Sequence, residues 1–287
     1  LSADGGRGCL NLLGSYDEAA LSAFSTALST NTAVTSIDLT AAYSVENGML
    51  TSGNPNLLLY VSENAAPENA TNVVKNGTCA DLSLNDGFAF AAPQAFVATR
   101  ATLNRNFTKG QKSTLCLPFA VENPQAYGAF FAFERYDADQ GLVCFSRADN
   151  LSANTAYVFN PSVEKLEFSE VEVSATPANL SSPGQAGLYG TLVPLVTPIT
   201  MSANMNVYGY AASDIPSQGI TAGQFVKAGN NVSVLPFRAF LALPAAQSPQ
   251  QVRSYFPGET TGICSPTEQS SANARYNLNG QHLFGPA

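Results

Sequence analysis

Hydrophobic positions follow a helical period near the start of the chain. The segment 15–28 places apolar residues on one face of a helix, and Ser15 and Glu18 have the spacing of an N-terminal capping box. The apolar residues on this face are Leu21, Phe24 and Leu28. Asn31 is a residue type that ends helices, so we expect one amphipathic helix that stops there.

A short strand is predicted next, at Val34 to Thr40, where apolar and polar residues alternate. Similar apolar pairs recur after 21 and 24 residues, inside the period of leucine-rich repeats. The pairs are Ile37 with Leu39, Leu58 with Tyr60, and Leu82 with Leu84. Turn-forming Gly, Pro and Asn residues lie between them. The pattern predicts a short leucine-rich-repeat-like α/β stack, and three unrelated strands are the alternative.

From Phe107 onward the helical period disappears. Short apolar runs follow one another, separated by Gly, Pro or Asn, which is typical of an antiparallel β-sandwich or barrel. The segment 130–145 predicts a hairpin with its turn at 137–141. We therefore expect a mainly β protein, with a leucine-rich-repeat-like α/β region at 1–106 and an antiparallel β domain at 107–245. A tail loop at 246–287 is expected to carry a terminal strand near Tyr276 to Gln281.

One predicted strand, at 165–173, changes its hydrophobic phase. Leu166 and Phe168 share one face, whereas Val171 and Val173 are one position out of step. A bulge near Ser169-Glu170 would return both pairs to the core and keep the glutamate out of it.

Composition narrows the possible functions of the 287-residue chain. Charged residues make up 12%, and 21 acidic against 13 basic residues give a net charge of −8, which argues against nucleic-acid binding. The 45% of hydrophobic residues can build a sizeable core, yet no run approaches the roughly 20 apolar residues of a membrane span. The chain opens with Leu1 rather than Met, so we expect a processed protein or a piece of a longer one.

The cysteine pattern gives no metal or redox motif. No C-x-x-C is present among Cys9, Cys79, Cys116, Cys144 and Cys264. Cys116 and Cys144 lie inside apolar runs, so we expect buried thiols in preference to a disulfide framework.

The sequence contains only weak signals for catalytic or metal sites. The single histidine, His282, lies in a Gly- and Asn-rich turn near the chain end, and no G-x-S-x-G elbow accompanies it. Asp137-x-Asp139 lacks the continuation of a calcium loop, so we interpret it as a turn. We predict no catalytic residue, metal site or cofactor.

Paired carboxylates leave one catalytic alternative open, a glycoside hydrolase. The acidic residues concerned are Glu134, Asp137 and Asp139 at the hairpin tip, and Glu164, Glu167, Glu170 and Glu172 in one strand region. The absence of Trp removes a common platform for sugar rings.

Two surfaces are candidates for binding. The first is the outward row of the repeat strands, which a stack would join into one face. This row consists of Ser36, Asp38, Thr40, Leu57, Leu59, Val61, Asp81, Ser83 and Asn85, with Asp38, Leu57, Leu59, Val61, Asp81 and Ser83 as the chosen candidates. The second is the tyrosine pair Tyr208 and Tyr210, which would stack on a sugar if exposed. The alternatives are that the β domain covers the apolar row and that the tyrosines are core.

Several short motifs carry a family resemblance. They are Asn54-Pro55-Asn56 before Leu58 and Tyr60, Asn72-Val73-Val74 leading into Asp81 to Leu84, Leu117-Pro118-Phe119, Leu151 to Tyr157, Tyr189-Gly190-Thr191, Pro236 to Phe240, and Tyr276 to Gln281. As a set they resemble Bacteroides-type secreted or cell-surface proteins, in which a leucine-rich-repeat-like segment precedes a β-sandwich-like domain. The resemblance implies an exported protein, often without an assigned activity.

Together these observations lead us to expect an exported surface or secreted interaction protein of the adhesion type, without catalytic activity. Its partner would be a host or surface protein or a glycan. A glycan-binding module, a carboxylate-based glycoside hydrolase and a structural spacer of a longer surface protein are the alternatives.

Overall fold

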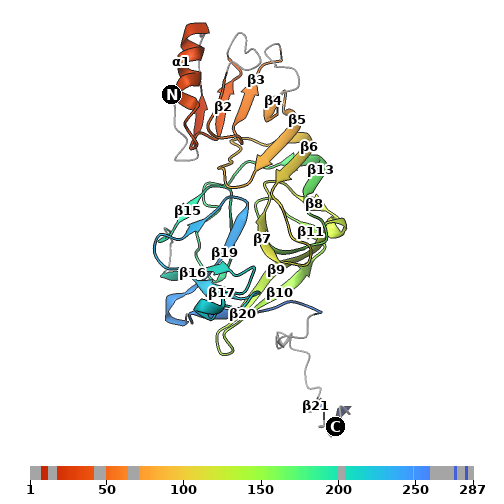
Figure 1. The fold of residues 1–287 in the computed structure, drawn as a ribbon. Coiled ribbons are helices and arrows are strands. Elements are labelled where there is room, and N and C mark those ends of the chain that lie inside the picture. The colour runs from red at the N-terminus through yellow and green to blue at the C-terminus, as the bar shows by residue number, and fades with distance from the viewer. Residues whose placement is uncertain are drawn as a thin grey trace.

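The computed structural model describes residues 8–11, 18–41, 50–63, 71–199, 204–247, 249–258, 275–276 and 282–283. Two large sheets contain most of the strands in this part of the chain, and only one α-helix is present in it, so the predicted mainly β class is confirmed. Figure 1 shows a mixed sheet with one helix beside it, and a nearly closed barrel below.

The mixed sheet has seven strands in the order β1-β2-β3-β4-β5-β6-β13. They are β1 (Cys9–Asn11), β2 (Ser36–Leu39), β3 (Leu58–Val61), β4 (Val73–Lys75), β5 (Thr78–Asn85), β6 (Phe96–Asn104) and β13 (Leu166–Val173). Strands β1 to β4 are parallel, β5 forms an antiparallel hairpin with β4, β6 is parallel to β5, and β13 is antiparallel to β6. The helix α1 (Glu18–Leu28) precedes β2, and Asn31 ends it as predicted, accepting hydrogen bonds from the backbone of Ala33 and Val34.

The second sheet has nine strands in the order β14-β19-β16-β17-β20-β10-β9-β12-β7. They are β7 (Ser113–Cys116), β9 (Gly128–Asp137), β10 (Leu142–Ala148), β12 (Ala156–Pro161), β14 (Gly187–Thr191), β16 (Met205–Tyr210), β17 (Phe225–Lys227), β19 (Arg238–Pro244) and β20 (Gln251–Tyr255). Strands β9 and β10 form the predicted hairpin, and β20 pairs in parallel with β10. Two strands cross the expected domain boundaries. Strand β20 of this sheet comes from the segment expected as a tail loop, and β13 of the mixed sheet comes from the segment expected as the antiparallel domain.

The barrel closes where the start of β19 meets β7. The Cys116 N–H donates to the carbonyl of Phe237 over 3.2 Å. The Thr114 hydroxyl bonds both the N–H and the carbonyl of Ala239, at 3.0 and 3.2 Å. A side-chain hydroxyl thus takes the place of one rung of backbone pairing where the two strands meet.

Short elements complete the described chain. The ribbons are β8 (Val121–Glu122) with β11 (Asn150–Leu151), β15 (Leu195–Val196) with β18 (Ser233–Val234), and β21 (Arg275–Tyr276) with β22 (His282–Leu283). The 3₁₀ turns are η1 (Pro124–Ala126), η2 (Pro216–Gln218) and η3 (Ala245–Gln247). The expected terminal strand near Tyr276 coincides with β21, while residues 277–281 lie outside the described part.

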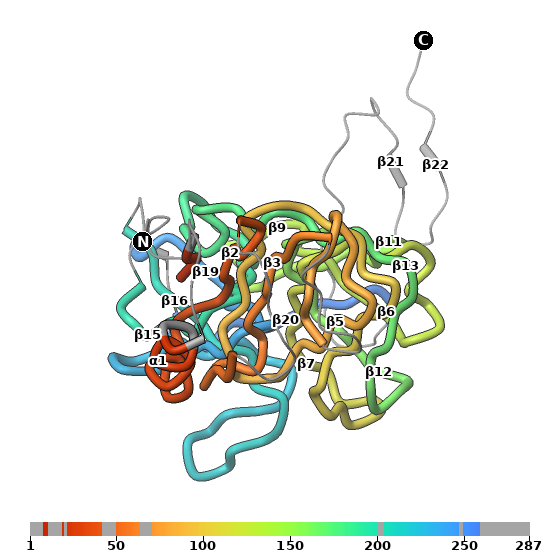
Figure 2. The backbone as a smooth tube through the Cα atoms, turned by 90° about the horizontal axis from the view of Figure 1, so that it is seen from above, coloured from red at the N-terminus to blue at the C-terminus, as the bar shows by residue number. Residues whose placement is uncertain are grey.

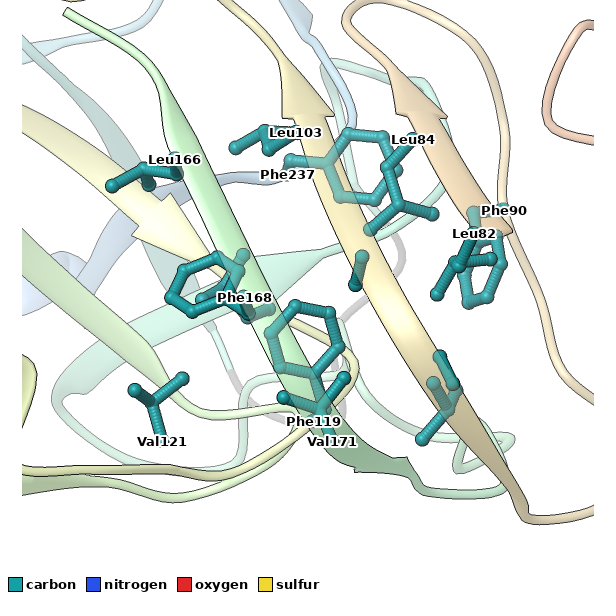
Figure 3. Packing of buried hydrophobic residues seen from close by; sticks show 14 of the residues in the cluster. Leu82, Leu84, Phe90, Leu103, Phe119, Val121, Leu166, Phe168, Val171 and Phe237 are labelled. Atoms are coloured by element: carbon teal, nitrogen blue, oxygen red, sulfur yellow. The ribbon is translucent and has the colours of Figure 1, made fainter. Parts of the chain in front are cut away.

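One hydrophobic cluster joins the mixed sheet to the barrel. Leu82, Leu84, Leu103 and Phe168 of the sheet pack with Phe119 and Phe237 of the barrel side, and all six are at most 4% exposed (Figure 3). Phe119 and Phe168 meet edge to face with ring centroids 5.1 Å apart. The two layers thus bury part of their apolar surface against each other, and the barrel also encloses a second cluster of its own around Phe145, Tyr208 and Leu241.

The opposite, outer face of the mixed sheet is covered by α1 at one end only. Leu28 of the helix packs with Ile37, Leu39 and Val61, which point away from the barrel. The helix lies beside β2 and β3, whereas β5, β6 and β13 lie at the other end of the sheet (Figure 2). The outer face is therefore apolar under α1 and open beyond it.

The structure does not show the leucine-rich-repeat-like stack. Ile37 is opposite Leu59 in the register of β2 and β3, so it shares a face with Leu59 and not with Leu58. The third pair, Leu82 with Leu84, lies on β5, which runs antiparallel to β4. Because side chains alternate along a strand, a one-residue error in alignment exchanges the two faces.

The predicted bulge at Ser169-Glu170 is also corrected. Both apolar pairs reach the core, yet the pairing of β13 with β6 keeps one register on either side of Glu170. The neighbouring strands change phase at the same level, between buried Cys79 and Leu82 on β5 and between buried Ala98 and Ala101 on β6. We call this the shared phase change; Ala80, Thr99 and Glu170 mark it, and Glu170 has a φ of 52°.

The cysteines follow the expected burial, with one correction. Cys9, Cys79 and Cys116 are buried free thiols, and desolvation raises the pKa of Cys79 to about 11 and that of Cys116 to about 12. Cys144 is fully buried but disulfide-bonded, so the expectation of a thiol there is wrong. An apolar run indicates burial of a cysteine but not its oxidation state.

Candidate interaction surface

The open end of the outer face presents an ordered set of polar side chains, which we call the polar face. It consists of Asp81, Ser83 and Asn85 on β5, Arg100, Thr102 and Asn104 on β6, and Glu167 and Ser169 on β13. The register aligns these residues in rows across the three strands. Their sequence neighbours Leu82, Leu84 and Leu103 point into the shared core, so alternation along each strand places the polar residues outside.

Side-chain hydrogen bonds connect the polar residues of β5 with those of β6. The Arg100 guanidinium donates two hydrogen bonds to Asp81, at 2.8 and 3.2 Å, and these bonds raise the pKa of Arg100. The Asn104 amide donates to the Ser83 hydroxyl over 2.8 Å and to the Asn85 side-chain oxygen over 3.1 Å. The Arg100 side chain is 62% exposed, so this ion pair orders the surface more than it stabilises the fold.

Buried asparagines hold the backbone under the polar face. The Asn72 side chain accepts a hydrogen bond from the N–H of Ser83 and donates one to its carbonyl. The Asn56 side chain accepts one from the N–H of Asn85 and donates one to its carbonyl. The backbone of two residues on the polar face is thereby fixed from within the protein. The sequence pattern predicted a turn at Asn56 and placed Asn72 only in a resemblance motif, because the bonds that these side chains make span up to 32 residues.

The predicted binding row divides between several environments. Asp81 and Ser83 lie together on the polar face, as expected. Leu57 and Val61 are buried, at 8% and 2% exposure, and Leu59 is partly buried in the same cluster. The cover over these residues is α1 and not the β domain, so they offer no exposed apolar patch.

Asp38 lies away from the polar face. It is opposite Tyr60 in the register of β2 and β3, on the side of the sheet that faces the barrel. Its carboxylate accepts hydrogen bonds from the N–H and the hydroxyl of Thr40, which closes a local turn after β2.

The predicted tyrosine platform is not available. Tyr208 is fully buried in the barrel, and its hydroxyl donates to the carbonyl of Pro249 over 2.8 Å. Tyr210 is partly buried and packs edge to face on Phe225, with ring centroids 5.1 Å apart. Both tyrosines belong to the barrel core, the fate that alternating aromatics most often have.

A charged cluster at the junction of the layers has a structural role. Arg238 of β19 forms a two-point ion pair with Asp86, just after β5. Arg105 is close by, donates to the carbonyl of Thr114 over 2.9 Å and lies over the Phe107 ring. Burial lowers the pKa of Arg105 to about 10. These contacts bind the end of the sheet to the barrel.

Two of the carboxylates considered for catalysis are engaged in local contacts at the hairpin tip. Glu134 pairs with its neighbour Arg135 at 2.9 Å, and Asp137 accepts a hydrogen bond from the N–H of Gln140 within the hairpin turn. In the part of the chain that the structure describes, no group of three or more His, Cys, Asp and Glu side chains could hold a metal ion. Nor is any helix of that part long and apolar enough to cross a membrane.

Comparison with protein-family models, with curated proteins and with solved structures finds no match to this chain.

Proposed function

We propose that the chain is an exported interaction protein that binds a protein partner through the polar face. The observation that carries the proposal is an open sheet face whose polar side chains are ordered by mutual contacts and by buried asparagines beneath them. An interaction surface that is already ordered loses little conformational entropy on binding.

The charge of the polar face indicates a basic partner. Asp81 is neutralised by Arg100, whereas Glu167 on the face and Glu170 and Glu172 on the same strand are exposed. These three glutamates of β13 contribute to the net charge of −8 of the chain. A partner surface with Lys and Arg residues would complement it and would be drawn to it before contact.

Two observations support export. Disulfides such as that of Cys144 persist mainly in oxidising compartments. The motif set resembling Bacteroides-type surface proteins points the same way. The finer assignment of residues 1–106 as a leucine-rich-repeat-like region belongs to this proposal, and the parallel pairing of β1 to β4 within it supports it.

The test is a biosensor screen of the purified chain against extracellular matrix proteins and mucins. We expect a basic protein to bind, with an affinity that falls as salt rises, and Glu167→Lys to weaken it about tenfold. Glu134→Lys on the barrel makes the same charge change at a side chain that is 41% exposed, so it is the matched control.

Two results would contradict the proposal. One is that no protein of the panel binds. The other is that a protein binds but responds equally to Glu167→Lys and Glu134→Lys, because then the polar face would not be the contact.

A further inference from the structure

A second site lies on the same sheet, at the carboxyl ends of β2, β3 and β4. The pocket there has a volume of about 360 Å³. This is within the range of small-molecule sites, and the carboxyl ends of parallel strands are where open sheets commonly bind ligands. Its polar lining consists of Thr40, Tyr60, Ser62, Glu63, Asn76 and Gln94.

Tyr60 is the most informative of these residues. It is 2% exposed, and its ring packs edge to face on Phe96 within the shared core, so its position is fixed. Tyr60 lines the pocket, and its hydroxyl makes one hydrogen bond within the described chain, a long one of 3.4 Å to the carbonyl of Gln94, which also belongs to the lining. A buried hydroxyl is normally satisfied at shorter distance, so this one retains capacity to donate and to accept.

The lining indicates the chemistry of the ligand. Hydroxyls and side-chain amides both donate and accept hydrogen bonds, as a sugar hydroxyl requires. Among the described lining residues no cation is present, and Glu63 carries a negative charge, so an anionic ligand is disfavoured. The side chains of Val61, Val74 and Ala95 complete the wall and suit the C–H face of a sugar ring.

We propose that this pocket binds a neutral sugar residue, with the Tyr60 hydroxyl as its specific contact. The site is separate from the polar face, so a glycan ligand here and a protein partner there would be independent activities.

The test uses the methyl glycosides of glucose, galactose, mannose and N-acetylglucosamine as probes, followed by ligand-observed NMR and calorimetry. We expect saturable binding of at least one of them. Tyr60→Phe keeps the ring and removes the hydroxyl, and should weaken binding about tenfold, the effect of one lost hydrogen bond. Tyr189→Phe is the matched control, because its hydroxyl bonds the carbonyl of Gln185 far along the chain from the pocket residues.

A second variant keeps the proposal falsifiable if Tyr60→Phe disturbs folding. Ala95 is exposed at the pocket wall, so Ala95→Leu should fold normally and block binding by filling space. The proposal is overturned if no probe binds at concentrations up to about 10 mM, well above the millimolar dissociation constants of weak ligands. It is equally overturned if Ala95→Leu and Tyr60→Phe leave binding unchanged.

Discussion

Asn54, Asn56 and Asn72 are at most 2% exposed, and each amide bonds backbone groups from separate segments. Asn54 donates to the carbonyls of Val34 and Ala89, which are 20 and 35 residues away. For single residues such as these, the sequence gives the residue type but does not indicate its hydrogen-bond partners. Asparagine next to proline predicts a turn, and only the assembled sheet shows that these amides are buried connectors.

Asn56→Ala should lower the free energy of unfolding by about 3 kcal/mol, since it leaves several buried backbone groups without a partner. These are the carbonyls of Asn85 and Phe88 and the N–H of Asn85. Urea denaturation measures the change. The exposed Asn104 gives the control, because Asn104→Ala should cost less than about 0.5 kcal/mol. Equal losses for the two variants would show that the buried amide contributes no more than a surface one.

The mixed sheet illustrates what strand patterns can and cannot predict. The helix, the hairpin at 130–145 and the phase change at 165–173 were all visible as local periodicity. The cause of the phase change was not, because β5, β6 and β13 change together and only their pairing reveals it. The binding row was wrong for a related reason, since one residue of register decides whether Leu59 faces α1 or the barrel, and the row's outer side is covered by α1.

Glu170 offers a direct test of the shared phase change. Its φ of 52° is unfavourable for residues with a Cβ and most unfavourable for β-branched ones. Glu170→Gly should therefore raise the free energy of unfolding by about 0.5 kcal/mol, and Glu170→Val should lower it by about 1–2 kcal/mol.

Glu172 is the control for this pair, because it is equally exposed on β13 but does not have a positive φ. There glycine should destabilise, by about 1 kcal/mol. Thermal or urea unfolding distinguishes the positions. A loss of stability from Glu170→Gly equal to that from Glu172→Gly would count against a left-handed backbone at residue 170.

The whole molecule is a sheet and a barrel that share one core. Composition and the many short apolar runs predicted the mainly β class, and a barrel was one of two architectures expected. The pairing of β13 with β6, across 63 to 77 residues, has no local signal. The two candidate sites also lack a complete local signal. Asp81 and Ser83 were identifiable as outward residues of the polar face. Their partners Arg100 and Asn104, and the pocket at Tyr60, depend on contacts between distant segments.

The shared core predicts that the two layers unfold together. Cys79 on the sheet and Cys116 on the barrel are both fully buried in it, so their thiols report on one layer each. In pulsed labelling with iodoacetamide and peptide mass spectrometry, both should become reactive at the same urea concentration. Because burial raises the pKa of Cys79 to about 11 and of Cys116 to about 12, the reactive thiolate stays scarce in the folded protein until the pH exceeds about 11.

A lower urea midpoint for Cys79 than for Cys116 would contradict this expectation, since the sheet would then open while the barrel stayed folded. Circular dichroism on the same samples supplies the reference for global unfolding.

The shared phase change also constrains how this protein can evolve. Removing Ala80 alone would leave β5 with regular alternation, so Leu82 and Leu84 would still face the core, but every pairing of β5 with β6 beyond that point would shift by one residue. The neighbours at Thr99 and Glu170 would keep their own phase, so the damage could be repaired only by matching deletions at three places in the gene. Insertions and deletions in natural variants should therefore be rare at these three positions and should accumulate in the connecting loops, where no neighbouring strand has to change with them.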